Sequence, residues 1–185
     1  MSPAAASDAR VRALLDERTA MLARRGIGQA RREATRAFLV CALGSERCGL
    51  PLGQVASVLP GKSCTALPGA PAGLRGIVAL SGGIVTVVDL AAALGLSTVE
   101  GSEAAGGHLV RLRSLEPPVA LAVERVLGIA QVAASLESGA EAGRAGSLGG
   151  EAVSGYAPPG SDAAGGIGEG FSLIDLPRLL RRFLP

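Results

Sequence analysis

The sequence predicts an all-β protein built from two small five-stranded β-barrel lobes that pack together, with an N-terminal helix and short helical segments. From residue 38 onward, apolar runs of four to six residues alternate with turns rich in Gly, Pro and polar residues, which is typical of short strands. The segments FLVCALGSERCGLPLGQVASVL (38–59) and HLVRLRSLEPPVALAVERVLGI (108–129) share one layout. Two such units are each too small to be stable singly, so we expect them to share a hydrophobic interface.

The core of this protein must be built from small side chains. Apolar residues make up 48% of the 185 residues, but only three Phe and one Tyr are present, and Trp is absent. Such a core depends on many Ala, Val and Leu contacts rather than on a few large aromatic ones.

The first half of the β region, residues 37–97, predicts one lobe. Its first two strands are joined by the polar turn GSER, which indicates a hairpin. Asp89 then opens the short helical stretch LAAALG, where its carboxylate can accept a hydrogen bond from a free helix N–H. The predicted strands are FLVCAL (38–43), CGLPL (48–52), QVASVL (54–59), CTAL (64–67), GIVAL (76–80) and IVTVV (84–88).

The second half, residues 108–185, predicts a second lobe of the same kind. Its ending GFSLIDLPRLL (170–180) resembles GIVTVVDLAAAL (83–94), since each runs from Gly through an apolar strand to Asp-Leu and a short helix. Pro177 falls in the first turn of that helix, where the missing N–H costs nothing. Residues 139–170 are rich in Gly and Ala, so we expect a mobile loop there.

The N-terminal segment, residues 1–36, is predicted to be an amphipathic, Arg-rich helix and a linker. The helix spans residues 8–25, with Ser7 or Asp8 as its cap, and Gly26 ends it. Residues 1–36 hold eight of the 18 basic residues but only four of the 16 acidic ones. No aromatic residues interleave these arginines, so a solvated helix face is favoured over a nucleic-acid-binding surface. The helix either packs on the domain or serves as a partner-binding arm.

The sequence favours a cytoplasmic protein without membrane insertion, cofactor or metal. No run reaches the roughly 18 to 20 apolar residues that cross a bilayer, and the N-terminus lacks the order of a signal peptide. Cys41, Cys48 and Cys64 show no Cys-x-x-Cys spacing, which argues against both a zinc site and a disulfide framework.

Catalytic residues are scarce in this sequence. His108 is the only histidine, and no Gly-x-Ser-x-Gly motif accompanies it. GGIGEG (165–170) precedes a predicted strand, whereas a phosphate-binding loop follows one. The matching positions of Asp89 and Asp175 after a strand indicate helix caps rather than a catalytic pair. We therefore predict a protein that is not an enzyme, and keep a small hydrolase that uses His108 as an alternative from another class.

Residues 38–96 resemble the first half of a CheW-like chemotaxis coupling domain. The resemblance rests on the order and spacing of Val55-Ala56-Ser57-Val58, Leu67-Pro68-Gly69-Ala70-Pro71, Gly76-Ile77-Val78-Ala79-Leu80-Ser81-Gly82 and Val88-Asp89-Leu90. The second half is similar through HLVRL, VALAVERVLGI and GEGFSLIDLPRLL, so the resemblance covers about residues 37–184. It implies two packed β-barrels and a non-enzymatic adaptor in a bacterial chemosensory pathway. The implied partners are a CheA-type histidine kinase and the cytoplasmic tip of a methyl-accepting chemoreceptor, in arrays at the membrane.

The resemblance also implies a receptor-binding groove between the lobes, bordered by Val55, Ser57, Gly76, Leu80, Ser81 and Gly82. The family's usual Glu in Val-x-Glu-Ile is Ser57 here, and its usual Arg in Asn-Leu-Arg-Gly is Ser81. In the family these two charges face each other, and loss of both partners of a pair can be nearly neutral for the fold. The alternative that follows is a divergent member that binds only one of the two partners, as an accessory or pathway-specific scaffold.

Overall fold

The computed structural model of the protein describes residues 35–96, 107–134, 136, 151–161 and 167–183. The N-terminal helix expected at 8–25 lies outside the described residues, as do residues 137–150 of the Gly- and Ala-rich segment. Residues from Thr35 onward form one compact unit. In the described part of the chain, no helix is long and apolar enough to cross a membrane.

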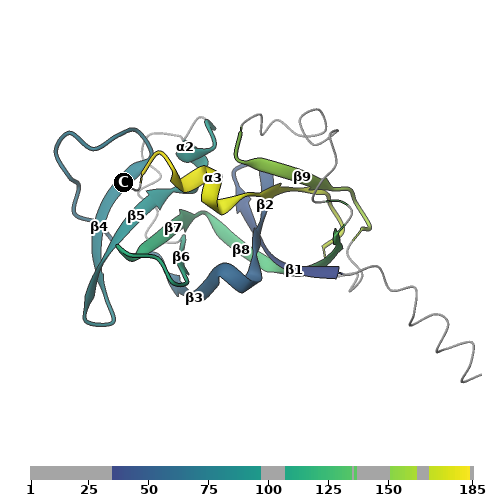
Figure 1. Ribbon diagram of the computed structural model, residues 1–185, viewed down its shortest axis with the longest axis horizontal. Helices are drawn as coiled ribbons and strands as arrows, with labels where there is room; N and C mark the ends of the chain where they lie inside the picture. The colour runs from purple at the N-terminus through teal and green to yellow at the C-terminus, as the bar shows by residue number, and fades with distance from the viewer. Residues whose placement is uncertain (1–34, 97–106, 135, 137–150, 162–166, 184–185) are drawn as a thin grey trace, which may run out of the picture. The chain divides into compact units, whose positions relative to one another are not determined.

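The described residues form ten strands and three short helical turns, and Figure 1 labels most of these elements. Their bounds, in chain order, are β1 (Thr35–Leu43), β2 (Glu46–Pro51), η1 (Leu52–Gln54), β3 (Val55–Pro60), β4 (Leu74–Leu80), β5 (Gly83–Asp89), α2 (Leu90–Ala93), β6 (His108–Leu112), β7 (Val119–Val123), β8 (Arg125–Ala133), β9 (Val153–Ala157), β10 (Phe171–Ile174) and α3 (Leu176–Leu180).

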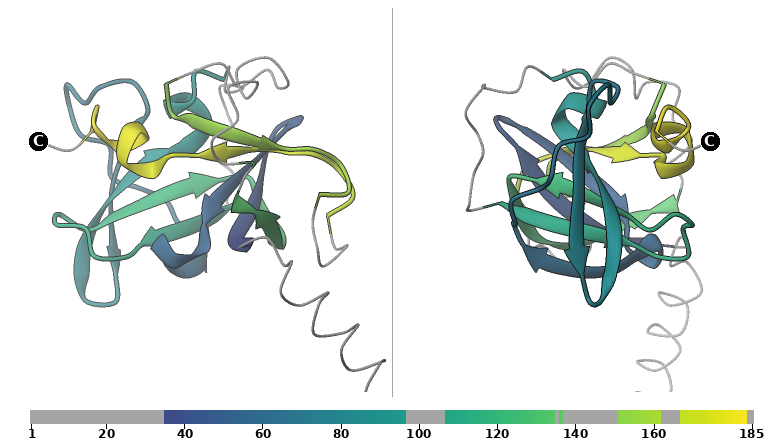
Figure 2. Two further views of the ribbon diagram at one scale, coloured as in Figure 1. Left: turned by 45° about the vertical axis from the view of Figure 1, so that its right-hand side comes forward. Right: turned by 90° about the vertical axis from the view of Figure 1, so that its left-hand side faces the viewer.

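The strands form two five-stranded sheets, which lie side by side in Figures 1 and 2. Sheet A has the order β8-β1-β2-β10-β9 and sheet B the order β3-β6-β7-β5-β4. The all-β prediction is therefore confirmed, together with the number of strands per unit. The sheets are not closed barrels, however, because no strand ladder between described residues joins β8 to β9 or β3 to β4.

Each sheet takes strands from both halves of the chain, which corrects the expectation that residues 37–97 and 108–185 form separate lobes. The hairpin β1–β2 is covered by β8 on one edge and β10 on the other, and the hairpin β6–β7 by β3 and β5. A two-stranded hairpin is only marginally stable in water, and its edges expose unpaired backbone groups. The exchanged strands β8 and β3 pair with an exposed edge of each hairpin.

The internal repeat seen in the sequence is preserved in the topology. If β1 to β5 are matched with β6 to β10, the strand order of sheet A becomes that of sheet B. The relative strand directions also agree between the two sheets. β2 pairs with β10 and β7 with β5 in parallel, while all the other ladders are antiparallel. The two halves are therefore equivalent units that have exchanged β3 and β8.

The largest hydrophobic cluster lies between the two sheets and contains residues of both. The unbroken apolar run of β1 is explained by burial on both faces of sheet A. Leu39 and Cys41 join the shared core, while Phe38 and Val40 join a second cluster on the other face. A third cluster lies on the far face of sheet B. The shared core includes Leu39, Cys41, Leu43, Cys48, Leu50 and Ile174 from sheet A, and Val55, Val88, Val110, Leu112, Val119, Leu121 and Val123 from sheet B.

Both predicted helix caps are confirmed. The Asp89 carboxylate accepts a hydrogen bond from the Ala92 N–H at 3.0 Å, and the Asp175 carboxylate accepts one from the Arg178 N–H at 3.1 Å. Such a bond at a helix N-cap contributes about 1 kcal/mol. Pro177 lies in the first turn of α3, as expected.

Two local predictions are wrong. The segment 64–67 is not a strand, since among its residues Thr65 alone pairs, in an isolated bridge with Ile77, and Leu67 stays exposed. Part of the Gly- and Ala-rich segment 139–170 is ordered, because β9 pairs with β10 along the edge of sheet A. The antiparallel ladder and the burial of Ala157 offset the backbone entropy on which the loop prediction was based.

The shared core predicts the effect of two substitutions. Leu121 is fully buried between the sheets, so Leu121→Ala should lower the free energy of unfolding by about 2 to 5 kcal/mol. Ile84 is 67% exposed, and Ile84→Ala should change it by at most about 0.5 kcal/mol. Urea denaturation followed by circular dichroism measures both. Equal losses for the two variants would contradict this description of the core.

Candidate docking surface

The six residues expected at the groove lie on two strands at opposite edges of sheet B. Val55 and Ser57 belong to the edge strand β3, while Gly76 and Leu80 belong to β4 at the other edge. Ser81 and Gly82 form the turn that joins β4 to β5. The residues are therefore not neighbours along one edge, and the link between the two groups runs across the sheet.

One row of directly opposed residues connects the two groups. Ser57 pairs with Arg111 of β6, Arg111 with Ala120 of β7, Ala120 with Val87 of β5, and Val87 with Gly76 of β4. Side chains of directly opposed residues share one face of a sheet. Ser57 and Gly76 thus lie at the two ends of a single row, and Arg111, which the sequence interpretation did not single out, lies beside Ser57.

The fold itself requires glycine at position 76, without any partner. Its φ is +135°, and a Cβ at this position would overlap the carbonyl oxygen of Thr65. Thr65 and Ile77 exchange two backbone hydrogen bonds of 2.8 and 2.9 Å, which hold the segment against β4. The close backbone approach that the sequence led us to expect from a partner is therefore made by the chain's own Thr65.

The turn Ser81-Gly82 is a two-residue hairpin loop between paired Leu80 and Gly83. Both central residues have positive φ, +51° and +81°, which defines the type I′ geometry that matches the twist of the strands. Both are exposed, and the hairpin ends in a free tip (Figures 1 and 2). Leu80, in contrast, is 5% exposed and packs in the third cluster, so its side chain is not available to a partner.

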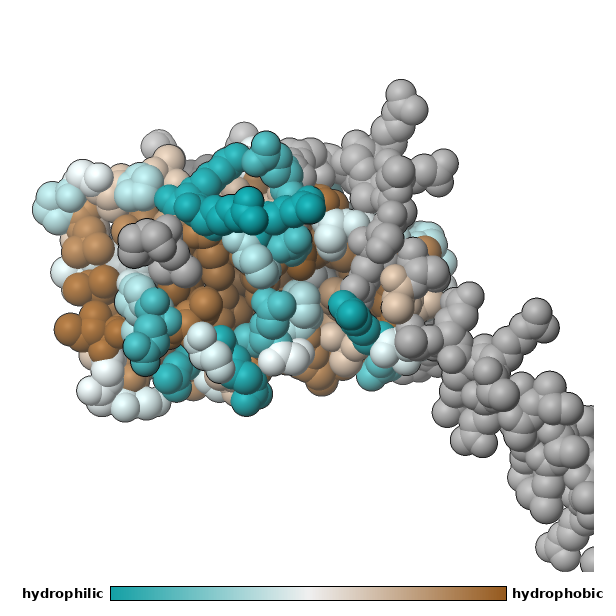
Figure 3. Space-filling model, viewed as in Figure 1, coloured by the Kyte–Doolittle hydropathy of each residue, from teal (hydrophilic) through white to brown (hydrophobic). Residues whose placement is uncertain are grey.

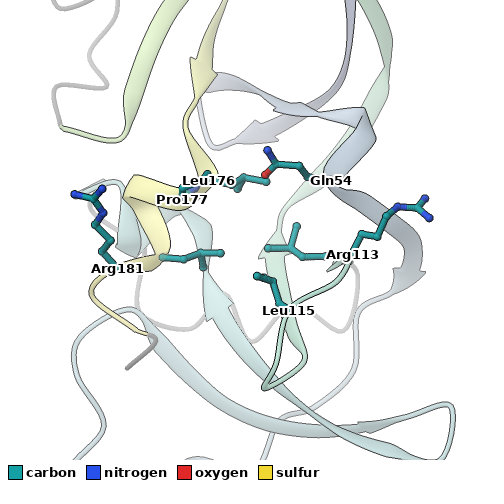
Figure 4. A pocket seen from close by; sticks show the side chains of 8 residues that line it. Gln54, Arg113, Leu115, Leu176, Pro177 and Arg181 are labelled. Atoms are coloured by element: carbon teal, nitrogen blue, oxygen red, sulfur yellow. The ribbon is translucent and has the colours of Figure 1, made fainter.

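A hollow of about 540 Å³ lies beside Val55, between α3, which follows sheet A, and the strands of sheet B. Figure 4 shows the side chains that border it. Leu112, in its wall, pairs directly with Val55, which is 7% exposed. The lining residues are Gln54, Leu112, Arg113, Leu115, Leu176, Pro177, Leu180 and Arg181.

Two hydrogen bonds fix this wall of the hollow. The Arg113 guanidinium donates to the Val55 carbonyl at 3.0 Å, and the Arg113 N–H donates to the Gln54 carbonyl at 2.8 Å. Arg113 and Arg181 lie on opposite sides of the hollow in Figure 4. The eight lining residues include two cations and no acidic group, so the hollow combines an apolar floor with a positive rim. The sequence interpretation missed it, because its walls come from three segments far apart in the chain.

Further apolar side chains are exposed outside the hollow. Ile84 on β5 and Ile129 on β8 are 67% and 52% exposed, and Val58 and Leu67 are exposed to a smaller extent. In Figure 3 apolar surface gathers over the β4–β5 end of the visible face, and more of it shows near the centre. Apolar patches of this kind, bordered by polar residues, are typical of surfaces that bind other proteins.

Groups that could perform chemistry do not assemble in the described residues. His108 Nδ1 is buried and has no hydrogen-bond partner there, whereas a catalytic triad engages both ring nitrogens. Among the described residues, no group of His, Cys, Asp and Glu could hold a metal ion. Cys41 and Cys48 are directly opposed and fully buried, and the hydrogen bond between the two thiols together with burial raises the pKa of the Cys48 thiol. Buried thiols of this kind are inert.

Two packed five-stranded sheets with an apolar hollow and a positive rim define a small β-sheet module suited to binding another protein. The chain belongs to the CheW-like domain family, whose profile matches residues 37–182. CheW-like domains serve as scaffolds and adaptors in chemotaxis signalling. A comparison with curated proteins finds no match.

Solved structures share this fold, and fifteen chains match. One of them is the crystal structure of the scaffolding protein TtCheW from Thermoanaerobacter tengcongensis. It has a TM-score of 0.64 and 21% sequence identity, and the match covers 80% of this chain and 94% of that chain.

Gly76 and Gly82 allow a test of which glycine serves the fold. Gly82→Ala should cost about 1 to 3 kcal/mol of unfolding free energy, because the residue has a left-handed backbone but no atom near its Cβ position. Gly76→Ala should cost clearly more, since the same kind of strain adds to the overlap with Thr65. Urea denaturation measures both, and a Gly76→Ala variant as stable as Gly82→Ala would contradict the assignment.

Proposed function

We propose that this protein is a non-enzymatic adaptor that couples chemoreceptors to a CheA-type histidine kinase in a bacterial chemosensory pathway. It binds the cytoplasmic tip of a methyl-accepting chemoreceptor on one surface and the regulatory domain of the kinase on another. It acts in the cytoplasm, in receptor arrays at the membrane, in swimming chemotaxis or in another form of motility. The family assignment over residues 37–182 supports this proposal.

The observation that carries the receptor contact is the apolar hollow beside Val55. A receptor tip is a helical structure, and an amphipathic helix binds by placing apolar side chains in a groove. The hollow offers Leu112, Leu115 and Leu180 for such side chains, and Arg113 and Arg181 for acidic groups on the same helix. The receptor groove then extends from the hollow along Val55 and Ser57, and the exposed turn Ser81-Gly82 is a second border of the receptor surface. Gly76 and Leu80 serve the fold instead, because Thr65 covers the first and the second is buried.

A second candidate function is a divergent adaptor that binds only one of these partners. Ser57 and Ser81 favour it, because both positions lack the charge that the family outline places there. A pathway-specific scaffold of this kind would retain the contact with the kinase and lose or change the contact with the receptor.

Calorimetric titration tests the two functions. The protein is titrated with a CheA-type regulatory domain and, separately, with a helical-hairpin fragment of a chemoreceptor tip, and then with both together. Micromolar binding to each partner, and binding of the second in the presence of the first, is the result expected for a coupler. Binding to the kinase domain alone supports the divergent adaptor. Binding to neither overturns both proposals.

The hollow makes a sharper prediction for the receptor tip. Leu115→Asp places a carboxylate on the apolar wall, and we expect it to weaken tip binding at least tenfold, or about 1.4 kcal/mol. The matched control is Ile129→Asp on β8, an exposed apolar residue outside the hollow, which should leave tip binding unchanged. The same calorimetric titration measures both. Equal effects of the two variants would remove the hollow from the receptor surface.

A further inference from the structure

Arg111 is an exception in a strand of apolar residues. It is the one charged residue inside HLVRL. It lies two residues after Leu109, which belongs to the third cluster on the far face of sheet B. Side chains two residues apart in a strand share a face, so Arg111 lies on the face that carries this cluster. The residue is half-buried, and its Nε atom is buried without a hydrogen-bond partner in the part of the chain that the structure describes.

The neighbours of Arg111 across the sheet are small and uncharged. Ser57 of β3 lies directly opposite on one side and Ala120 of β7 on the other. The ion pairs Arg47–Glu169 and Arg178–Asp175 involve other arginines. Arg111 therefore lies between two short side chains, one strand in from the edge of sheet B, and pairs with no carboxylate among the described residues.

A buried N–H of a charged group without an acceptor is unfavourable, and an acceptor supplied by a ligand removes this cost. Arginine favours carboxylates, because its planar guanidinium can donate two parallel hydrogen bonds to the two carboxylate oxygens. The apolar flanks point to a protein carboxylate rather than a free anion, since Leu59 and Leu109 lie on the same face as Arg111 and pack in the third cluster.

We propose that Arg111 is a specificity-determining residue of the docking surface, and that it binds an Asp or Glu side chain of a receptor helix that docks along the edge strand β3 at Ser57. The proposal rests on the receptor contact proposed above and names its chemistry. The family outline places a cation at position 81 and an acid at position 57, and this chain has serine at both. The cation opposite Ser57 in this chain is Arg111 of β6. The opposing acid comes from the partner instead.

The test uses the full chain and the chemoreceptor-tip fragment in calorimetric titrations. Arg111→Gln should weaken tip binding about tenfold, and Arg111→Glu should weaken it further because two carboxylates then meet. Arg125→Glu, at an exposed arginine on the edge strand of sheet A, is the matched control and should change affinity less than twofold. Binding of the kinase domain should be the same in all three variants, and denaturation curves establish that each variant is folded.

Ser57→Glu separates an interaction role of Arg111 from a purely structural one. The new carboxylate lies directly opposite Arg111 and satisfies it internally, so the variant should be at least as stable as the parent chain and should bind the tip more weakly. A reversed pair, Arg111→Glu with the partner's acidic residue changed to Lys, should restore binding.

The outcomes distinguish this inference from the proposed function. A parent chain that fails to bind the tip overturns both. A parent chain that binds the tip, with Arg111→Gln binding equally well, overturns the assignment of Arg111 alone. In that case the arginine is only a charged residue on the far face of sheet B.

Discussion

The shared core between the two sheets is the constraint on which the rest of the structure depends. Each sheet carries one hydrophobic cluster of its own on its outer face, and its inner face contributes to the shared core. Neither sheet can therefore bury all of its apolar surface alone. Because of the exchange of β3 and β8, the chain passes between the two sheets twice, from β2 to β3 and from β7 to β8. Val55, the first residue of β3, enters the shared core where the chain passes from sheet A to sheet B.

The docking surface is a consequence of this exchange. The chain leaves β2 through η1 and joins sheet B at β3, while α3 follows β10 of sheet A, and the hollow opens between this crossing and α3. Arg113 fixes the first crossing by bonding to the carbonyl groups of Gln54 and Val55. A surface built in this way has a fixed shape before a partner arrives, which lowers the entropic cost of binding. Such preorganisation suits a scaffold.

Local signals in the sequence were sufficient for much of the fold, and long-range ones were missed. The hairpins, the caps at Asp89 and Asp175, and the repeat of two five-stranded units depend on turn residues, capping groups and alternation within a few positions. The exchange of β3 and β8 depends on which hairpin edge a strand covers, which no local pattern encodes. The same holds for Gly76, whose neighbour Thr65 is eleven residues away, and for Arg111 beside Ser57. The only sequence sign of Arg111 was a charge at an inward position of an apolar strand.

The relocation of charge within sheet B bears on what kind of adaptor this is. An acid and a base that face each other within one protein satisfy each other, so they contribute to its shape and little to the choice of partner. A single cation between Ser57 and Ala120 leaves its hydrogen-bonding capacity to a ligand, and it excludes a partner that presents a positive or an apolar group there. If Arg111 binds a carboxylate of the partner as proposed, the two serines mark a more selective surface, because the acid that would oppose the cation comes from the partner. On this view a coupling function and a divergent sequence are compatible, because loss of the internal pair need not mean loss of the proposed contact.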